Sequence, residues 1–311
     1  MDPILGLHHV TATVDDAQAD LDFACDALGL RLVKKTVNFD NNGVYHFYYG
    51  DERGRPGTLW TTFPYKDMGV PVGTKGEGQV TVTSFSVPTA ALPFWADRLK
   101  GRGMTVTEAE HFGEASIVVR DPSGLLIELV GADSDTRAPW VHGDVTAAQA
   151  VRGLHSVTMT VQDIAPTLEF MRSLLGVEVV SDMPGRLRVG LAGDGPGQLV
   201  DILHGGGTGP ARNGLGTVHH VAMATTDGDA QLRLREELVR RGVQVTKVMD
   251  RQYFTSIYFR EPGGVLFEVA TQGPGFLVDE PLEALGRGLK LPPWVETNRP
   301  AIEASLPPVR Y

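Results

Sequence analysis

The chain has 311 residues, enough for two ordinary domains, and its 42% hydrophobic and 21% charged residues are typical of a globular protein. A formal net charge of −10 argues against binding to nucleic acid or an anionic membrane, and the single cysteine, Cys25, excludes an intramolecular disulfide framework. Because no apolar stretch approaches the ~18 residues of a membrane span, we expect a cytoplasmic protein without a membrane partner.

Four segments of the chain repeat one plan: an opening strand, a helix that ends in glycine, and further strands. The opening strands, which alternate polar and apolar residues with period two, are predicted at 7–14, 80–87, 154–161 and 218–225. The modules that contain them cover about 5–64, 78–133, 153–204 and 216–272. They divide the chain into an N-terminal half, 1–140, and a C-terminal half, 141–311. The C-terminal half ends in a proline-rich arm that we expect to pack on the body or on a partner.

Each module carries the signals of a short amphipathic helix after its opening strand. A residue that can cap a helix precedes apolar residues spaced three and four apart, and a glycine follows them. The candidate first residues are Asp15 or Asp16, Thr89, Asp163, and Asp227 or Asp229. Glycine-rich turns lead into the last strand of modules two and four, at 121–124 and 261–264.

Four βαβββ modules with these turns resemble the vicinal oxygen chelate superfamily, which includes glyoxalases, extradiol dioxygenases and fosfomycin-resistance proteins. The resemblance covers nearly the whole chain. It implies an α+β fold in which the modules pair into two barrel-like, half-open sheets, one of which closes around a metal site. The fold alone does not give a reaction, so the site residues must indicate it.

Two opening strands contain paired histidines, His8-His9 in the first module and His219-His220 in the fourth. Neighbouring residues of a strand point to opposite faces. In the first strand the apolar residues at positions 10, 12 and 14 are expected to meet the helix, so that His9 faces the concave side. The residues equivalent to His9 in modules two to four are Val82, Ser156 and His220.

The last strand of module four supplies a carboxylate, Glu268, in an otherwise apolar run, where an unpaired charge would cost several kcal/mol. Its equivalents are Glu128 in module two, Asp201 in module three, and Thr61 or Thr62 in module one. Only modules one and four together offer two inward histidines and a carboxylate, the ligand set of non-haem Fe(II) oxygenases. We therefore expect a metal site between the first and fourth modules, and a purely structural barrel from modules two and three.

Module four also carries an arginine and a tyrosine near the expected site. Aligning its hairpin with that of module two places Arg251 and Tyr258 opposite His111 and Val118. With the histidine pairs and Glu268, they resemble the hydroquinone ring-cleaving dioxygenases of this superfamily, which act on para-diols.

This second resemblance implies roles for individual residues. It implies that His9, His220 and Glu268 bind Fe(II), and the same ligand set also suits Mn(II). It implies that five further residues surround the metal: His8, Thr11, His219, Arg251 and Tyr258. Simple alternation along the strands would instead turn His8 and His219 away from the cavity.

The function implied by the resemblance is an Fe(II)-dependent dioxygenase that opens a hydroquinone-type ring with O2. Its partners would be a small aromatic substrate and O2, and the sequence leaves a homo-oligomer open. Arg251 would stabilise developing oxyanion charge, and either His219 or Tyr258 would act as the acid–base group.

Three alternatives share the fold. A catechol-type extradiol dioxygenase would take its ligands from modules three and four, where Ser156 breaks the pattern. A glyoxalase-like isomerase or transferase usually has a fourth protein ligand, and no second inward carboxylate is evident between modules one and four. A non-catalytic binding protein would lack the metal residues. Metal analysis and O2 uptake separate these alternatives from a para-diol dioxygenase.

Overall fold

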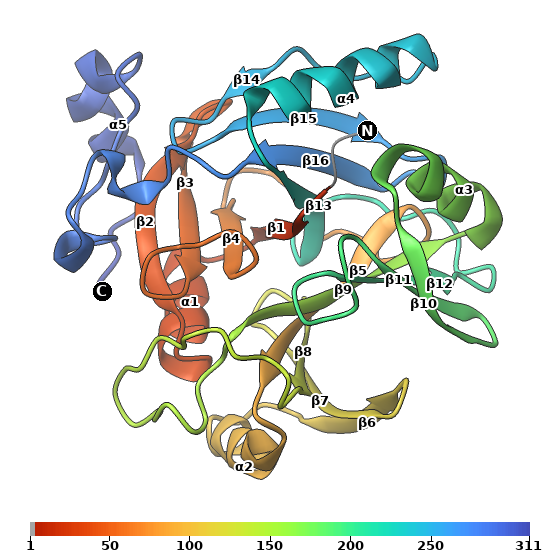
Figure 1. The fold of residues 1–311 in the computed structure, drawn as a ribbon. Coiled ribbons are helices and arrows are strands. Elements are labelled where there is room, and N and C mark those ends of the chain that lie inside the picture. Colours follow the sequence, from red (N-terminus) through yellow and green to blue (C-terminus); the bar gives the residue numbers. More distant parts are fainter. Residues whose placement is uncertain (1–3) are drawn as a thin grey trace.

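The computed structural model describes residues 4–311, whose strands form two curved eight-stranded sheets (Figure 1). Module one comprises β1 (Gly6–Val14), α1 (Ala17–Leu21), η1 (Asp22–Ala27), β2 (Arg31–Asn38), β3 (Asn41–Gly50) and β4 (Leu59–Pro64). Module two comprises β5 (Gln79–Val87), η2 (Thr89–Ala91), α2 (Leu92–Gly101), β6 (Thr107–His111), β7 (Glu114–Arg120) and β8 (Leu126–Gly131).

The second half of the chain repeats the pattern. Module three comprises β9 (Gly153–Val161), α3 (Ile164–Leu175), β10 (Glu178–Met183), β11 (Arg186–Gly190) and β12 (Leu199–His204). Module four comprises β13 (Thr217–Thr225), α4 (Gly228–Arg240), β14 (Met249–Asp250), β15 (Thr255–Arg260) and β16 (Leu266–Thr271). The predicted α+β class with four βαβββ modules is therefore confirmed.

The modules pair in a nested order. The first sheet has the strand order β14-β15-β16-β13-β1-β4-β3-β2 and joins module four to module one. The second has the order β10-β11-β12-β9-β5-β8-β7-β6 and joins module three to module two. The central strands β1 and β13 run antiparallel, so the two ends of the repeat lie side by side (Figure 1).

Two β-bulges interrupt the pairing of β1 with β13. Leu7 and His9 pair with Met223 and Ala222, which leaves His8 as an extra residue on β1. Further along, Thr11 and Ala12 pair with His220 and Val218, which leaves His219 as an extra residue on β13. A bulge redirects the side chain of its extra residue, so strict alternation does not hold at these two histidines.

The helices begin where the sequence predicts, with one change of type. Aspartate side chains accept a hydrogen bond from a first-turn N–H at Asp16, Asp163 and Asp227. The helix after Thr89 starts instead with the 3-10 turn η2, which has no side-chain cap. The first helix continues as the π-helix η1, whose wider turns bury Phe23, Ala24, Cys25 and Ala27 together. No helix of the described chain is long and apolar enough to cross a membrane.

The interior of the second sheet is filled by its own polar side chains. Glu128 accepts hydrogen bonds from Ser84 and Ser116, at 2.6 and 2.7 Å. Asp201 accepts one from Arg188 Nε at 2.7 Å, and is also paired with Arg186. Both carboxylates are therefore occupied by protein partners. Neither is free to bind a metal ion at the position in the second sheet that corresponds to the histidine site of the first.

The C-terminal arm packs on the outer strands of the first sheet. It contains η3 (Phe276–Val278), η4 (Leu282–Ala284), η5 (Glu296–Asn298) and α5 (Arg299–Ser305), beside β2 and β3 in Figure 1. Lys34 on β2 is completely buried and binds the carboxylates of Asp279 and Glu280 in the arm. This buried cluster fixes the arm to the sheet.

Asp20 on α1 is expected to make the stability of the fold depend on pH. Its side chain is buried, with Oδ2 accepting from Tyr49 at 2.7 Å and from Thr62, while Oδ1 has no partner. Burial raises the pKa of Asp20 to about 7. The folded chain therefore holds this proton more tightly than the unfolded chain. The contribution of the Asp20 proton to the free energy of unfolding is fully present below about pH 4 and is lost as the pH rises through 7.

The isosteric Asp20→Asn variant should lack this loss. Between pH 4 and pH 8 the free energy of unfolding of the wild type should fall by on the order of 4 kcal/mol more than that of the variant. Denaturant titrations of metal-free protein measure the difference. The control variant Asp22→Asn changes an exposed carboxylate that is bonded to Gln18, and its free energy of unfolding should depend on pH as that of the wild type does. Parallel curves for wild type and Asp20→Asn would contradict the assignment.

Candidate metal centre

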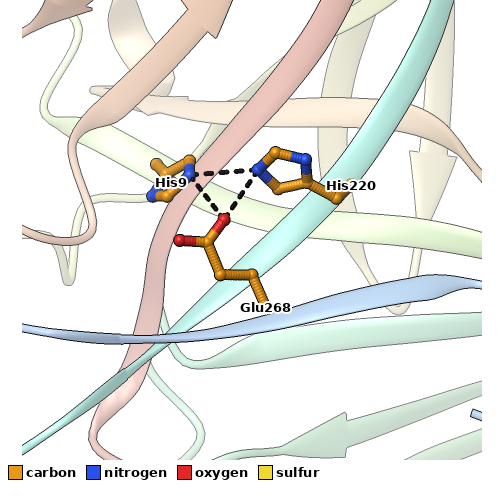
Figure 2. Close-up of side chains that lie close together, drawn as sticks. All are labelled: His9, His220 and Glu268. Carbon is orange, nitrogen blue, oxygen red and sulfur yellow. Dashed lines mark hydrogen bonds and ion pairs between the residues drawn. The ribbon is translucent and has the colours of Figure 1, made fainter. Parts of the chain in front are cut away.

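Three side chains from three adjacent strands point at one another in the first sheet (Figure 2). The Nε2 atoms of His9 on β1 and His220 on β13 lie 3.3 Å apart. Glu268 Oε2 on β16 lies 3.3 Å from His9 Nε2 and 2.8 Å from His220 Nε2. Within residues 4–311, this is the one group of three histidine, cysteine or carboxylate side chains whose ligand atoms converge in this way.

The strand pairing explains why these residues meet. Thr11 of β1 pairs with His220, which brings His9 close to His220 across the central strand pair. β13 and β16 run parallel, with Ala222 opposite Glu268, so the glutamate side chain reaches back past Ala222 toward His220. Residues nearly at opposite ends of the chain therefore share one buried point.

The donor set fits a divalent metal ion. All three side chains are buried, and Glu268 is fully inaccessible. Glu268 Oε1 accepts a hydrogen bond from Ser256, but Oε2 has no hydrogen-bond donor in suitable geometry, although both imidazoles lie close to it. Burial alone would raise the pKa of Glu268, yet the two imidazoles hold it well below its usual range. An ionised carboxylate oxygen without a donor, beside two ring nitrogens, is typical of a metal site that requires a cation.

Each histidine of the triad is oriented by the preceding histidine. His8 Nδ1 lies 2.8 Å from His9 Nδ1, and His219 Nδ1 lies 2.8 Å from His220 Nδ1. Burial lowers the pKa of both His8 and His219 to about 3, so both rings are neutral and can accept a hydrogen bond. The contact fixes each triad ring with its Nε2 toward the common point, as outer hydrogen bonds do for metal-binding histidines.

A cavity of ≈ 390 Å³ opens on the triad. His219, Arg251 and Tyr258 line it, together with the triad itself. The sequence-based expectation that alternation turns His219 away from the cavity is wrong, because His219 is the extra residue of a bulge. His8 lies outside the lining, beside His9 and against Phe254, with the ring centroids of His8 and Phe254 4.9 Å apart.

Thr11 lies one layer behind the cavity. Its hydroxyl is completely buried and lies 2.7 Å from the hydroxyl of Thr61. Thr61 in turn lies 3.0 Å from His46 Nε2, and it is His46 that lines the cavity. Thr11 therefore reaches the cavity only through this chain of hydrogen bonds.

Arg251 and Tyr258 form a polar wall of the cavity. Arg251 Nε donates to the Tyr258 hydroxyl at 3.1 Å, and its Nη2 lies 3.1 Å from Asp40 Oδ2. Burial raises the pKa of Tyr258 well above its usual value, so the phenol keeps its proton. Burial opposes the charge of Arg251, but Tyr258 and Asp40 outweigh it and raise the pKa of the guanidinium. The wall therefore offers a fixed positive charge and a phenolic proton.

Several residues of the cavity were not found from the sequence. The strand β3 contributes His46 and Tyr48, and the turn before it contributes Asp40. Ser256 on β15 binds the triad glutamate. The sequence feature that could have indicated His46 and Tyr48 is their spacing of two residues in β3, which puts both side chains on one face of the strand.

Comparison with known proteins gives a consistent result. A family model described as the Glyoxalase/Bleomycin resistance protein/Dioxygenase superfamily matches residues 6–129 and 153–269. The chain is 41% identical to the Bacillus subtilis (strain 168) protein named "Putative ring-cleaving dioxygenase MhqO", over 98% of this chain and 96% of that protein. It is 37% identical to the chlorohydroquinone/hydroquinone 1,2-dioxygenase of Sphingobium indicum, over 94% of this chain and 92% of that enzyme.

A crystal structure supports the same relationship. The crystal structure of a Bacillus subtilis (strain 168) protein described as a "putative dioxygenase" superposes with a TM-score of 0.95 at 40% identity, covering 100% of this chain and 99% of the other. At this similarity the arrangement of all four modules is shared.

Proposed function

Because the chain belongs to the glyoxalase/bleomycin resistance protein/dioxygenase superfamily, we propose that it is a metal-dependent, ring-cleaving dioxygenase that opens hydroquinone-type para-diols with O2. The convergence of His9, His220 and Glu268 at the base of a cavity carries the proposal. The activity named for the Sphingobium relative supports a para-diol as substrate. The buried, unpaired Cys25 supports a cytoplasmic location.

The metal we propose is Fe(II), held by His9 Nε2, His220 Nε2 and Glu268 Oε2, and Mn(II) suits the same ligands. When bound, the ion supplies Lewis acidity at a substrate hydroxyl and a path for electrons between the ring and O2. The neighbouring histidines keep the ligand rings in place. A ring that binds metal through Nε2 carries its proton on Nδ1, so His9 and His220 donate to His8 and His219.

This arrangement assigns a role to His219. Since its Nδ1 accepts from His220, the remaining proton of the neutral His219 ring sits on Nε2. His219 lines the cavity, so it can present this N–H to an oxygen of the substrate. His8 has the same tautomer but donates to the backbone at Thr271, and its role is to position His9.

Arg251 and Tyr258 act on charge and protons. Arg251 Nε donates to the phenolic oxygen, so the phenol is not the donor in this contact, and Tyr258 lines the cavity. Tyr258 can therefore donate a proton to an oxygen of the reacting ring, and Arg251 stabilises negative charge that develops beside it. Thr11 supports this site from behind, through Thr61 and His46.

Oxygen uptake tests the proposal. Metal-free protein is loaded with Fe(II) or Mn(II) under nitrogen, and an oxygen electrode follows uptake after addition of hydroquinones or catechols. We expect one O2 consumed per hydroquinone, faster than with catechol, and a ring-opened product by mass spectrometry. A loaded protein that consumes no O2 with any para-diol would contradict the proposed function.

A further inference from the structure

The two halves of the metal-bearing sheet are related by an approximate twofold axis between β1 and β13. His9 and His220 are equivalent under this relation. Thr11 lies two residues after His9 and is paired with Thr61 on β4. Ala222 lies two residues after His220 and is paired with Glu268 on β16. Thr61 is therefore the counterpart of Glu268. The side of the metal position that faces module one has no carboxylate and is open to an added ligand.

His46 occupies this open side. On module four, Tyr258 pairs with Glu268, and Ser256 on the same strand binds that glutamate. On module one, Tyr48 pairs with Thr61, and His46 two residues before it binds Thr61 through Nε2 at 3.0 Å. His46 is thus the counterpart of Ser256, but its larger ring extends into the cavity.

The ring of His46 is held in one orientation. It packs between Tyr48 and Phe63, with centroid distances of 4.0 and 4.3 Å. Its Nε2 is occupied by Thr61, and Thr61 is itself bonded to the buried Thr11. Two aromatic contacts and a hydrogen bond leave the ring little freedom, as a preorganised binding group requires.

The second ring nitrogen has no protein partner. His46 is only 9% exposed, and among residues 4–311 no side chain or backbone group bonds to its Nδ1. A polar atom in such a place is normally satisfied by a ligand or by water. Since the ring lines the cavity on the side where the metal position lacks a protein ligand, this nitrogen is available to a group that binds there.

We propose that His46 is a substrate-binding residue whose Nδ1 hydrogen-bonds an oxygen of the aromatic substrate on the open, module-one side of the triad. This inference rests on the proposed function for the kind of substrate. It concerns binding rather than turnover, so it can be tested without O2.

The test compares three variants of the full chain loaded with Mn(II). His46→Phe keeps the aromatic packing and removes both nitrogens, His46→Asn keeps a polar atom near Nδ1, and His46→Gln keeps one near Nε2. Calorimetry under nitrogen gives the Kd of hydroquinone, and elemental analysis gives the metal content. We expect full metal content in each variant, a Kd raised about tenfold in His46→Phe, and recovery in His46→Asn but not in His46→Gln.

Unchanged Kd in His46→Phe would overturn the inference, and so would better binding by His46→Gln than by His46→Asn. Loss of metal from His46→Asn would overturn it too, because the residue would then support the metal site itself.

The outcome of this test is separable from the outcome of the test of the proposed function. A wild type that binds hydroquinone without consuming O2 would refute the dioxygenase while leaving the assignment of His46 testable by Kd. A wild type that does not bind hydroquinone would refute both.

Discussion

Replacing Glu268 by glutamine is expected to remove the metal and, with it, ring cleavage. Glu268 is the sole carboxylate of the triad, and its Oε2 lies 2.8 and 3.3 Å from the two ring nitrogens. Glutamine keeps the shape of the side chain but loses the charge that balances a divalent cation. Residues that merely orient ligands change metal affinity 10- to 100-fold, so loss of a ligand should weaken binding by at least about 100-fold. Chelator competition and elemental analysis measure the affinity, and kcat/KM should fall to background.

The second sheet supplies a matched control for this variant. Glu128 is the equivalent carboxylate of module two, and it is also buried, but its partners are Ser84 and Ser116. Glu128→Gln should keep the metal and the activity of the wild type. A Glu268→Gln protein with stoichiometric metal and full turnover would show that the triad is not the metal site. Equal losses in both variants would point to a general effect on folding.

Tyr258→Phe should lose turnover while keeping the metal. The variant removes only the hydroxyl, which accepts from Arg251 Nε at 3.1 Å and which burial keeps protonated. If this hydroxyl donates the proton needed during ring opening, kcat should fall by about 10²–10⁴-fold. Steady-state oxygen uptake at saturating hydroquinone gives kcat, and metal content should match that of the wild type.

Tyr48→Phe is the appropriate comparison. Tyr48 lines the same cavity and holds the equivalent position opposite Thr61, but within residues 4–311 no hydrogen bond joins its hydroxyl to an arginine. Its loss should change kcat only slightly. A Tyr258→Phe enzyme with the kcat of the wild type would assign proton transfer to another group, and His219 is the candidate that also lines the cavity.

The central part of the site could be predicted because it depends on local rules. Alternation along a strand fixes the face on which His9, His220 and Glu268 lie, and the repeat supplies the alignment between modules. A hydrophobic core on one face leaves the other face for the metal, as the complete burial of Val10, Ala12 and Val14 shows. Modules two and three could be rejected as a metal site without knowing which strands pair, because they carry no histidine at the inward position.

The position of His219 in the cavity wall could not be predicted in this way, whereas His8 lies outside the cavity lining, as alternation predicts. Each is the extra residue of a bulge, and a bulge is a property of two paired strands rather than of one. The strands concerned hold His9 and His220, which are 211 residues apart in the chain. Alternation within one strand carries no information about a partner so distant.

His46 was missed for a related reason. Within its own strand it reads as one polar residue among the aromatic residues of β3, a pattern typical of a buried strand. Its importance comes from Thr61, which pairs with Tyr48 on the neighbouring strand and takes the place of a carboxylate. Similarly, the role of the arginines in the second sheet depends on the pairing of β11 with β12, which brings Arg188 to Asp201.

The nested pairing of the modules determines the order in which the two sheets can form during synthesis. The inner sheet uses strands from one continuous stretch, β5 to β12, so it can form while the rest of the chain is still being translated. The outer sheet must wait, because β1 emerges first and its partner β13 belongs to the last module. The entropic cost of closing so long a loop grows only slowly with length, so the delay affects the rate of assembly more than the final stability. A nascent chain that ends before Glu268 carries both histidines without the carboxylate, so the three side chains can converge only after the last module is complete.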